Sequence, residues 1–383
     1  MKRFILIIMA VLLAISFCSC KKEVQEMVPV SANPVVTEEY ISIVALGDNL
    51  LHMPVVNSGK KADGTYEYSH LFENLQPYIK NADIAVIGQE TMFGGDELGY
   101  SGYPMFNSPT DMGKTLVNEG FDVVLHASNH TLDKRAEGIE NTLNFWKNYP
   151  EVTVLGINES QAEKDTVKIV ENKGVKLALL NYTYGTNGFT LPSGKEYLIN
   201  YIDEDKISKD AAFAEGNADF TIAFLHWGTE YSIKPDNSQK ELAQKMCEWG
   251  VDLIIGAHPH VIEPVEWIEA ENGNKMLVYY SLGNFVSRQL EARNLLGGLA
   301  SVTLKYDGEN VNIDKYSLIP IVTHYDSSYK NFGVYTLDSY TDEMAKQHGV
   351  AYHSGSVSVE RWKNMVDETF EGYDLSAVAY TFD

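Results

Sequence analysis

Cysteine is scarce in this chain of 383 residues, which contains only three: Cys18, Cys20 and Cys247. The first two lie near the N-terminus, within a segment that we expect to be processed. Cys247 is then the only ordinary thiol, and an intrachain disulfide is excluded. Stability must come from a packed core, for which a hydrophobic content of 44% is ample. Cys247 itself lies in an amphipathic helical pattern and is expected to be a small core residue.

Positive charge is the second shortage. The chain has 30 Lys and Arg against 53 Asp and Glu, which gives a formal net charge of −23. A protein of this kind repels nucleic acid and anionic lipid, so we expect no nucleic-acid partner. Any anionic substrate must be held by a local positive centre.

Two catalytic motifs are also absent. No Gly-x-x-x-x-Gly-Lys stretch occurs, so the chain is not expected to drive synthesis with ATP itself. The stretch "GYSGYP" (99–104) lacks the Gly-x-Ser-x-Gly pattern, and no strand and helix frame it. A serine nucleophile is therefore disfavoured.

Long apolar runs are missing except at the N-terminus, where Phe4–Phe17 follows a basic start. This run is short for a membrane span and ends in small residues, as export signals do. The residues around Cys20 resemble a bacterial lipoprotein cleavage site, so 1–20 is predicted to be a lipoprotein signal peptide with Cys20 lipidated. An uncleaved anchor helix is the alternative, and Cys18 is a rival acceptor. Either way the protein would be extracytoplasmic and held to the cell membrane.

The remainder divides into three parts. Residues 21–38 are polar, contain two prolines and are predicted to form a flexible tether. Residues 39–325 alternate short apolar runs with helical patterns, which predicts an α/β domain with sheets covered by helices. Residues 326–383 form a C-terminal extension that is rich in Tyr and Ser. A hairpin is expected to turn at Asp307-Gly308.

The predicted elements follow from periodicity and from capping residues. The expected strands are 41–48, 82–90, 121–130, 152–156, 175–183, 219–228, 251–260 and 276–285, and the expected helices are 108–120, 134–148 and 238–249.

Polar residues follow the carboxyl ends of these strands. At such ends, α/β sheets expose loops and helix N-termini, where function concentrates. Each of these residues taken alone is typical of a helix cap or loop, but together they indicate one metal-binding rim. The candidates are Asp48, His52, Glu90, Asn129, His130, His226, His258 and His260. His126 lies inside an apolar run and is expected to be a core histidine.

The pair His258 and His260 flanks Pro259. Proline favours extended geometry in the preceding residue, and positions i and i+2 of an extended segment point to the same side. Imidazole, carboxylate and amide-oxygen ligands together suit Zn, Mn, Fe or Ni rather than Ca. Two divalent cations held by Asp48 and Glu90 would leave a positive surplus for an anionic substrate.

These motifs resemble the CapA family of poly-γ-glutamate capsule synthesis proteins, which is related to the calcineurin-like metallophosphoesterases. The matching stretches are "GDNLLH", "GQE", "ASNHTLD", "LHWGTEY", "GAHPHVIEP" and "YSLGNF". The resemblance implies a metallophosphoesterase-type layered sandwich, in which two β-sheets are flanked by helices. It also implies divalent metal ions, two in number, with Mn, Fe or Zn as candidates.

The resemblance further implies a role for each matching residue. Asp48 and His260 would bind the first metal, Glu90 would bridge, and Asn129, His226 and His258 would bind the second. His130 would contact the substrate and protonate the leaving oxygen, and Asp133 would orient His130.

This chain departs from the wider phosphoesterase superfamily at two positions. Glu90 stands where those proteins have Asp. Leu50 stands where they have the histidine of an Asp-x-His start, so a single-metal site stays open. His52 follows two residues later and is counted among the candidate ligands. Lys134, Arg135 and Arg288 are close to the motifs and could contact anionic groups, although solvated surface charge is the commoner role.

Two functions are compatible with these features. The first is a membrane-anchored, metal-dependent hydrolase that acts on a phosphoester or on an anionic polymer of the capsule or cell envelope. The second is a non-catalytic accessory protein that works in a capsule-synthesis membrane complex and helps to make or export poly-γ-glutamate or another polymer.

Overall fold

The computed structural model describes residues 38–381, which belong to one compact unit. The predicted signal peptide, the lipidation of Cys20 and the tether as far as residue 37 lie outside the described residues. None of the helices within 38–381 combines the length and the apolar character that crossing a membrane requires.

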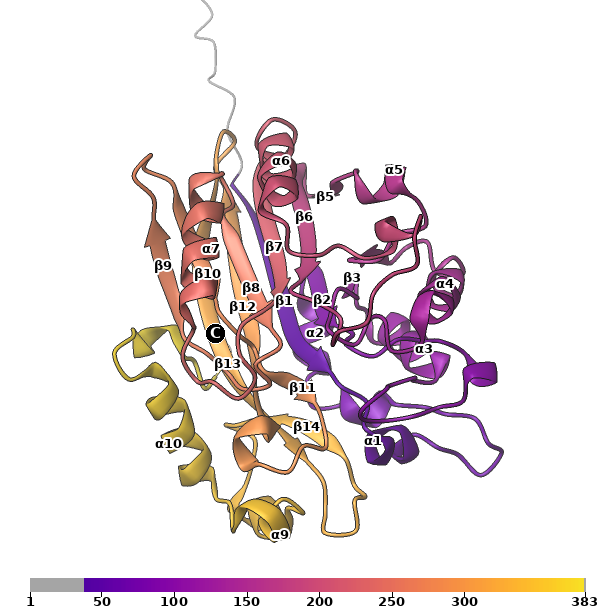
Figure 1. Ribbon diagram of the computed structural model, residues 1–383. Helices are drawn as coiled ribbons and strands as arrows, with labels where there is room; N and C mark the ends of the chain where they lie inside the picture. The colour runs from indigo at the N-terminus through magenta and orange to yellow at the C-terminus, as the bar shows by residue number, and fades with distance from the viewer. Residues whose placement is uncertain (1–37, 382–383) are drawn as a thin grey trace, which may run out of the picture. The chain divides into compact units, whose positions relative to one another are not determined.

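Two β-sheets form the centre of the described unit (Figure 1). The first has eight strands in the order β14-β13-β12-β1-β2-β3-β4, with β11 paired to β1, and the second has six in the order β5-β6-β7-β8-β10-β9. Strands β1 to β4 are mutually parallel, as are β6, β7, β8 and β10. The predicted α/β class with two sheets flanked by helices is confirmed.

The strands are β1 (Glu39–Asn49), β2 (Ile84–Gly88), β3 (Val123–Leu125), β4 (Thr153–Leu155), β5 (Lys168–Asn172), β6 (Val175–Thr183), β7 (Phe220–His226), β8 (Leu253–Ala257), β9 (Val265–Glu269), β10 (Lys275–Tyr279), β11 (Asn284–Val286), β12 (Leu296–Tyr306), β13 (Val311–His324) and β14 (Gly333–Thr336).

The helices are α1 (Met53–Ser58), α2 (Gln76–Asn81), α3 (Thr110–Glu119), α4 (Arg135–Trp146), α5 (Gln161–Lys164), α6 (Glu204–Glu215), α7 (Asn237–Glu248), α8 (Asp342–Gln347), α9 (Ala351–Ser354) and α10 (Val359–Phe370).

Successive side chains along the strands of the second sheet point to opposite faces, and each face packs in a different hydrophobic cluster. Leu253 and Ile255 of β8 join the large cluster shared with the first sheet, whereas Ile254 joins a cluster with α6 and α7. These two helices cover the outer face of the second sheet (Figure 1). Strands that are buried on both faces explain why the sequence shows nearly continuous apolar runs. Cys247 of α7 is buried in the outer cluster, as expected.

Local signals set the helix limits. Asp236 and Gln239 form a capping box at the start of α7, and Gly120 ends α3 in the left-handed conformation with a φ of 95°. The three predicted helices correspond to α3, α4 and α7. The predicted hairpin is also confirmed, because β12 and β13 pair around the turn at Asp307-Gly308.

The prediction of one strand over 276–285 is wrong. That run is divided between β10, which pairs with β8 in the second sheet, and β11, which pairs with β1 in the first. The intervening residues cross from one sheet to the other, with Asp48 N donating to the Gly283 carbonyl at 2.9 Å. The run over 121–130 is also shorter than predicted, because β3 ends at Leu125.

The C-terminal extension packs on the same body. Strand β14 continues the first sheet beside β13, and Val378 forms an isolated bridge with Leu318. Trp362 of α10 is fully buried in the main hydrophobic cluster, with its ring centroid 6.1 Å from that of His348.

Trp362→Ala tests the contribution of this extension to stability. Truncating a fully buried tryptophan should lower the free energy of unfolding by about 3–5 kcal/mol, measured by equilibrium chemical denaturation. Tyr352→Ala is the matched control, because Tyr352 is 87% exposed in the same extension and should change stability by less than about 0.5 kcal/mol. Equal stability of the two variants would contradict a structural role for α10.

Candidate functional site

The two sheets contribute different chemistry to one buried cluster. The first sheet supplies oxygen ligands and the imidazole of His130 from β1 and from the segments after β2 and β3, and the second supplies the imidazoles of His226, His258 and His260 from β7 and from the turn after β8. Parallel strands within a sheet bring their carboxyl ends to one edge, and the packing of the sheets places the two edges together. The cluster contains the buried residues Asp48, Glu90, Asn129, His130, His226, His258 and His260.

Two glycines allow the strands that carry these ligands to pass close to other backbone. A Cβ at Gly47, directly before Asp48, would lie 1.9 Å from the Gly283 carbonyl oxygen. A Cβ at Gly256 would lie 2.0 Å from the Tyr280 carbonyl oxygen. Since no side chain fits at either position, glycine is needed for this approach.

Glu90 lies among imidazoles from both sheets. Its Oε1 atom is 3.8 Å from His226 Nε2 and 4.0 Å from both His260 Nε2 and His130 Nε2. These distances are too long for direct hydrogen bonds. They leave a space between the carboxylate and the rings that a cation could occupy.

Asp48 lies near the other ring nitrogens of His226 and His260. Its Oδ1 is 3.6 Å from His226 Nδ1, and its Oδ2 is 3.5 Å from His260 Nδ1. The Oδ2 atom also accepts a hydrogen bond from His258 N at 3.0 Å. Asn129 Oδ1 lies 3.0 Å from His226 Nε2. The structure therefore brings together all the proposed ligands except His52.

The donor set fits a divalent metal. Both carboxylate oxygens of Glu90 and Nδ1 of His258 are buried without a hydrogen-bond partner among the described residues. Burial, followed by the charge of Asp48, raises the pKa of Glu90 well above its ordinary value. Leaving a buried carboxylate unpartnered is unfavourable, and a bound cation would supply the missing interaction.

The imidazoles differ in their electrostatics. Burial lowers the pKa of His258 to about 3 and that of His226 well below its ordinary value, and the neighbouring histidines act in the same direction. Burial would also lower the pKa of His260, but the charges of Glu90 and Asp48 raise it to about 9. His226 and His258 are thus held in the neutral form that binds metals.

The prediction that His258 is extended is wrong. Its φ is 101° and that of His260 is 59°, both in the left-handed range that non-glycine residues rarely adopt. Strand β8 ends at Ala257, and the turn is held by Tyr231 N, which donates to the Pro259 carbonyl at 2.8 Å. The two imidazole centroids are 5.9 Å apart, so the rings converge through a strained turn.

His130 is oriented as the sequence suggested. Its Nδ1 lies 2.8 Å from Asp133 Oδ2, which also accepts a hydrogen bond from Phe106 N at 2.7 Å. The ring packs edge-on against Phe106, with the centroids 4.7 Å apart. Its Nε2 is left facing Glu90. This arrangement fixes the ring and leaves one nitrogen free for proton transfer.

Asn284 was not anticipated as part of the site. Its Oδ1 lies 3.0 Å from His260 Nδ1, and it pairs with Asp48 in the register of β11 against β1. A partner at Nδ1 fixes the orientation of a metal-binding imidazole and directs Nε2 toward the metal. The motif "YSLGNF" contained this residue, but its contact with His260 depends on the packing of the two sheets.

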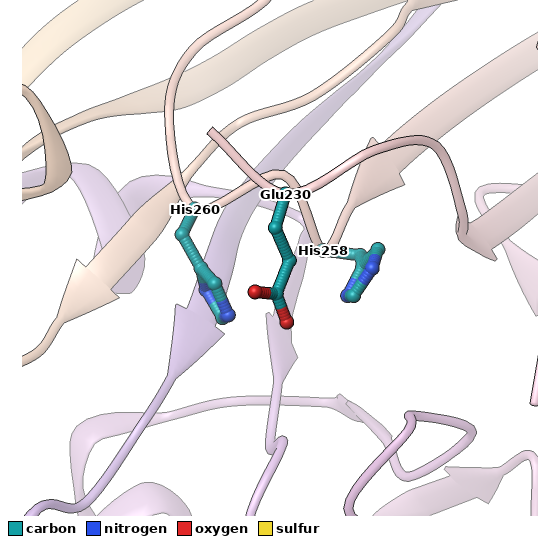
Figure 2. A group of neighbouring side chains, drawn as sticks. All are labelled: Glu230, His258 and His260. Carbon is teal, nitrogen blue, oxygen red and sulfur yellow. The ribbon is translucent and has the colours of Figure 1, made fainter. Parts of the chain in front are cut away.

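Glu230 was also missed. Figure 2 shows its carboxylate between the rings of His258 and His260. The ligand atoms of these three residues lie within 4.8 Å of one another, as do those of Asp48, Glu90 and His260. The signal in the sequence was the position of Glu230 in "LHWGTEY", four residues after His226.

His52 belongs to neither of these ligand groups. Its Nδ1 accepts a hydrogen bond from Arg288 N at 3.3 Å, and its ring packs edge-on against Phe106. Burial lowers the pKa of His52 to about 4. Its placement is that of a neutral wall residue.

His126 is a core histidine, as expected. It is fully buried, and its Nε2 accepts a hydrogen bond from Trp146 Nε1 at 2.8 Å. Burial lowers its pKa to about 3.

A cavity of about 1000 Å³ opens beside the ligand cluster. Asn129, His130, Glu230 and His260 line one part of it. The remaining wall is largely apolar and aromatic and includes Tyr103, Met105, Phe106, Phe189 and Leu290. A site of this kind can hold the polar group of a substrate at the cluster and its organic part against the wall.

The three basic candidates are placed differently. Arg288 lines the cavity, whereas Lys134 and Arg135 do not. The guanidinium of Arg135 lies 3.7 Å from the centroid of the Phe189 ring and donates to the Leu132 carbonyl.

Solved structures with a similar arrangement include the NAD nucleotidase NadN of Haemophilus influenzae, with a TM-score of 0.48 and 12% identity. That similarity covers 90% of this chain and 64% of NadN. The calcineurin-like phosphoesterase YfkN of Bacillus subtilis has a TM-score of 0.44 and 13% identity, over 88% of this chain and 98% of that one.

Sequence comparison places the chain in a family. It is 29% identical over 301 residues to the PGA biosynthesis protein CapA of Bacillus subtilis (strain 168), covering 75% of this chain and 73% of that protein. It is 25% identical over 304 residues to the capsule biosynthesis protein CapA of Bacillus anthracis, covering 76% and 72%. The model of the family described as bacterial capsule synthesis protein PGA_cap matches residues 42–289, and the chain belongs to this family.

Proposed function

We propose that this protein is a metal-dependent phosphoester hydrolase that acts in capsule or cell-envelope polymer metabolism. The observation that carries the proposal is the buried Glu90 carboxylate, which has no hydrogen-bond partner among the described residues and faces imidazoles from the second sheet. The adjoining cavity and the His130–Asp133 pair supply a place for substrate and a group for proton transfer. Membership in a capsule synthesis family supports the biological setting.

Each ligand has a distinct part in holding the metal. Asp48, Glu90 and His260 form one ligand group, and Asn129, His226 and His258 lie next to it. Glu230 reaches His258 and His260 from the solvent side. One or two divalent ions bound here, with Mn, Fe and Zn as candidates, would polarise a phosphoester and activate water.

His130 serves as the general acid in this proposal. Because Nδ1 is held by Asp133, Nε2 is the atom that carries the proton toward the cluster. Proton transfer to the leaving oxygen typically contributes about 10²–10⁴-fold to the rate. Phe106 fixes both groups, since its N–H binds Asp133 and its ring packs on His130.

The protein is further proposed to be extracytoplasmic and anchored by a lipid on Cys20, with an anionic polymer or phosphoester as substrate and a capsule-synthesis membrane complex as partner. The signal-like N-terminus supports the location, and the excess of acidic residues agrees with a substrate captured by bound cations.

A non-catalytic accessory role is the second candidate. The names of its relatives, a PGA biosynthesis protein and a capsule biosynthesis protein, favour a part in polymer synthesis. In that case the bound metal would hold the two sheets together.

His130→Ala and His258→Ala separate these functions. In the full chain supplied with Mn²⁺, turnover on a panel of phosphomonoesters and phosphodiesters should fall by about 10²–10⁴-fold in His130→Ala, with the metal content retained. His258→Ala should lose both metal and turnover, as measured by elemental analysis and product release. Bound metal with no turnover on any ester in the unmodified protein would favour the accessory role.

Glu230→Gln tests whether this carboxylate is a ligand. Its removal should weaken Mn²⁺ binding by at least about tenfold, measured by isothermal titration calorimetry, because the ion loses a charged contact. Glu291→Gln is the matched control, since Glu291 lines the same cavity and hydrogen-bonds to Ser354 rather than to the histidines. Unchanged Mn²⁺ affinity in Glu230→Gln would exclude Glu230 as a ligand.

A further inference from the structure

Arg288 lies in the wall of the cavity beside the ligand cluster and has no ion-pair partner among the described residues. It lies two residues after the end of β11, and its backbone N–H donates a hydrogen bond to His52 Nδ1. Its side-chain Nε is buried without a hydrogen-bond partner, and its guanidinium forms no ion pair within residues 38–381. A buried donor without an acceptor is unfavourable, so this group is suited to an acceptor that arrives with a ligand.

A second arginine in the same wall shows the contrast. Arg293 forms a close ion pair with Glu368 and donates to the Met365 carbonyl at 3.0 Å. Its charge is therefore used to hold α10 against the sheet. The chain has 53 acidic and 30 basic residues, yet the cavity-facing Arg288 has no acidic partner within 38–381. Glu291, which also lines the cavity, is hydrogen-bonded to Ser354.

Tyr329 holds the guanidinium in place. The Arg288 Cζ atom lies 4.3 Å from the centroid of the Tyr329 ring, which is a favourable cation–π distance. The loop that carries Tyr329 is organised by Asp326, which accepts hydrogen bonds from the N–H groups of Ser328 and Lys330. A guanidinium that contacts an aromatic ring in this way can still bind a carboxylate or phosphate through its other N–H groups.

This pairing joins the part of the chain that matches the family model to a part that lies beyond it. Arg288 lies at the end of the segment that matches the family model, 42–289, and Tyr329 belongs to the C-terminal extension beyond it. Tyr329 does not line the cavity itself, so the extension supports the cavity wall from behind, through its contact with Arg288.

We propose that Arg288, supported by Tyr329, forms a subsite for a second anionic group on the substrate. The substrate would be a phosphoester with a carboxylate or phosphate at its other end, and the segment between them would lie along the apolar wall formed by Met105, Phe106 and Leu290. This inference rests on the proposed function, because it assumes that the phosphoester binds at the ligand cluster. It adds the class of substrate that the cavity would bind.

Binding of non-hydrolysable phosphonates tests the subsite independently of turnover. Phosphonoalkanoic acids and alkane bisphosphonates of increasing chain length are compared with alkylphosphonates of the same lengths, by isothermal titration calorimetry on the full chain with Mn²⁺. At the matching length, the unmodified protein should bind the probe with two anionic ends about tenfold tighter. Comparing the carboxylate and phosphonate ends identifies which anion the subsite prefers.

Arg288→Gln should abolish this preference and leave the affinity for alkylphosphonates within about twofold, whereas Arg288→Lys should keep part of it. Arg293→Gln is the matched control and should retain the preference, because its guanidinium already binds Glu368. No preference at any length in the unmodified protein, or a preference that survives in Arg288→Gln, would overturn the subsite.

The outcomes also separate this proposal from the hydrolase function. Phosphoester turnover without a preference for two anionic ends would leave the hydrolase in place and remove the subsite. A preference that depends on Arg288, in a protein that hydrolyses no ester, would retain the subsite and remove the hydrolase.

Discussion

The burial of two carboxylates at the junction of two sheets is the constraint on which the site depends. Asp48 and Glu90 are each 1% exposed, and the oxygens of Glu90 lack any hydrogen-bond donor among the described residues. Transfer of such a group from water is costly unless charge compensates it. The three imidazoles that face Glu90 come from β3, β7 and β8 or the turns after them, so compensation requires both sheets to be in place.

That requirement accounts for local features that would otherwise be unfavourable. His258 and His260 adopt positive φ values, and glycines at 47 and 256 occupy positions where any Cβ would overlap a carbonyl oxygen. Strain of this kind persists when surrounding contacts determine the conformation, and it often marks a functional site. Here the backbone is held by hydrogen bonds from Tyr231 N to Pro259 and from His258 N to Asp48.

Charge links the site to the rest of the molecule. A strongly acidic protein has little affinity for anions over most of its surface. The cavity differs from that surface in two respects. Its ligand cluster is suited to binding cations, and its wall contains the guanidinium of Arg288, which has no ion-pair partner among the described residues. With cations bound in the cluster, an anion would be attracted to this cavity rather than to the rest of the surface.

The sequence by itself determined the fold class, the main helices, the hairpin and most of the cluster. Strand burial, caps and turns are local properties, and the carboxyl ends of parallel strands meet at one edge, so the positions of Asp48, Glu90, Asn129 and His226 could be inferred. Only the tertiary structure decided how 276–285 divides between the sheets, because the apolar run is equally suited to either. Likewise, the turn at His258, the approach of Glu230 and the contact between Arg288 and Tyr329 depend on packing between residues far apart in the chain, which no periodicity records.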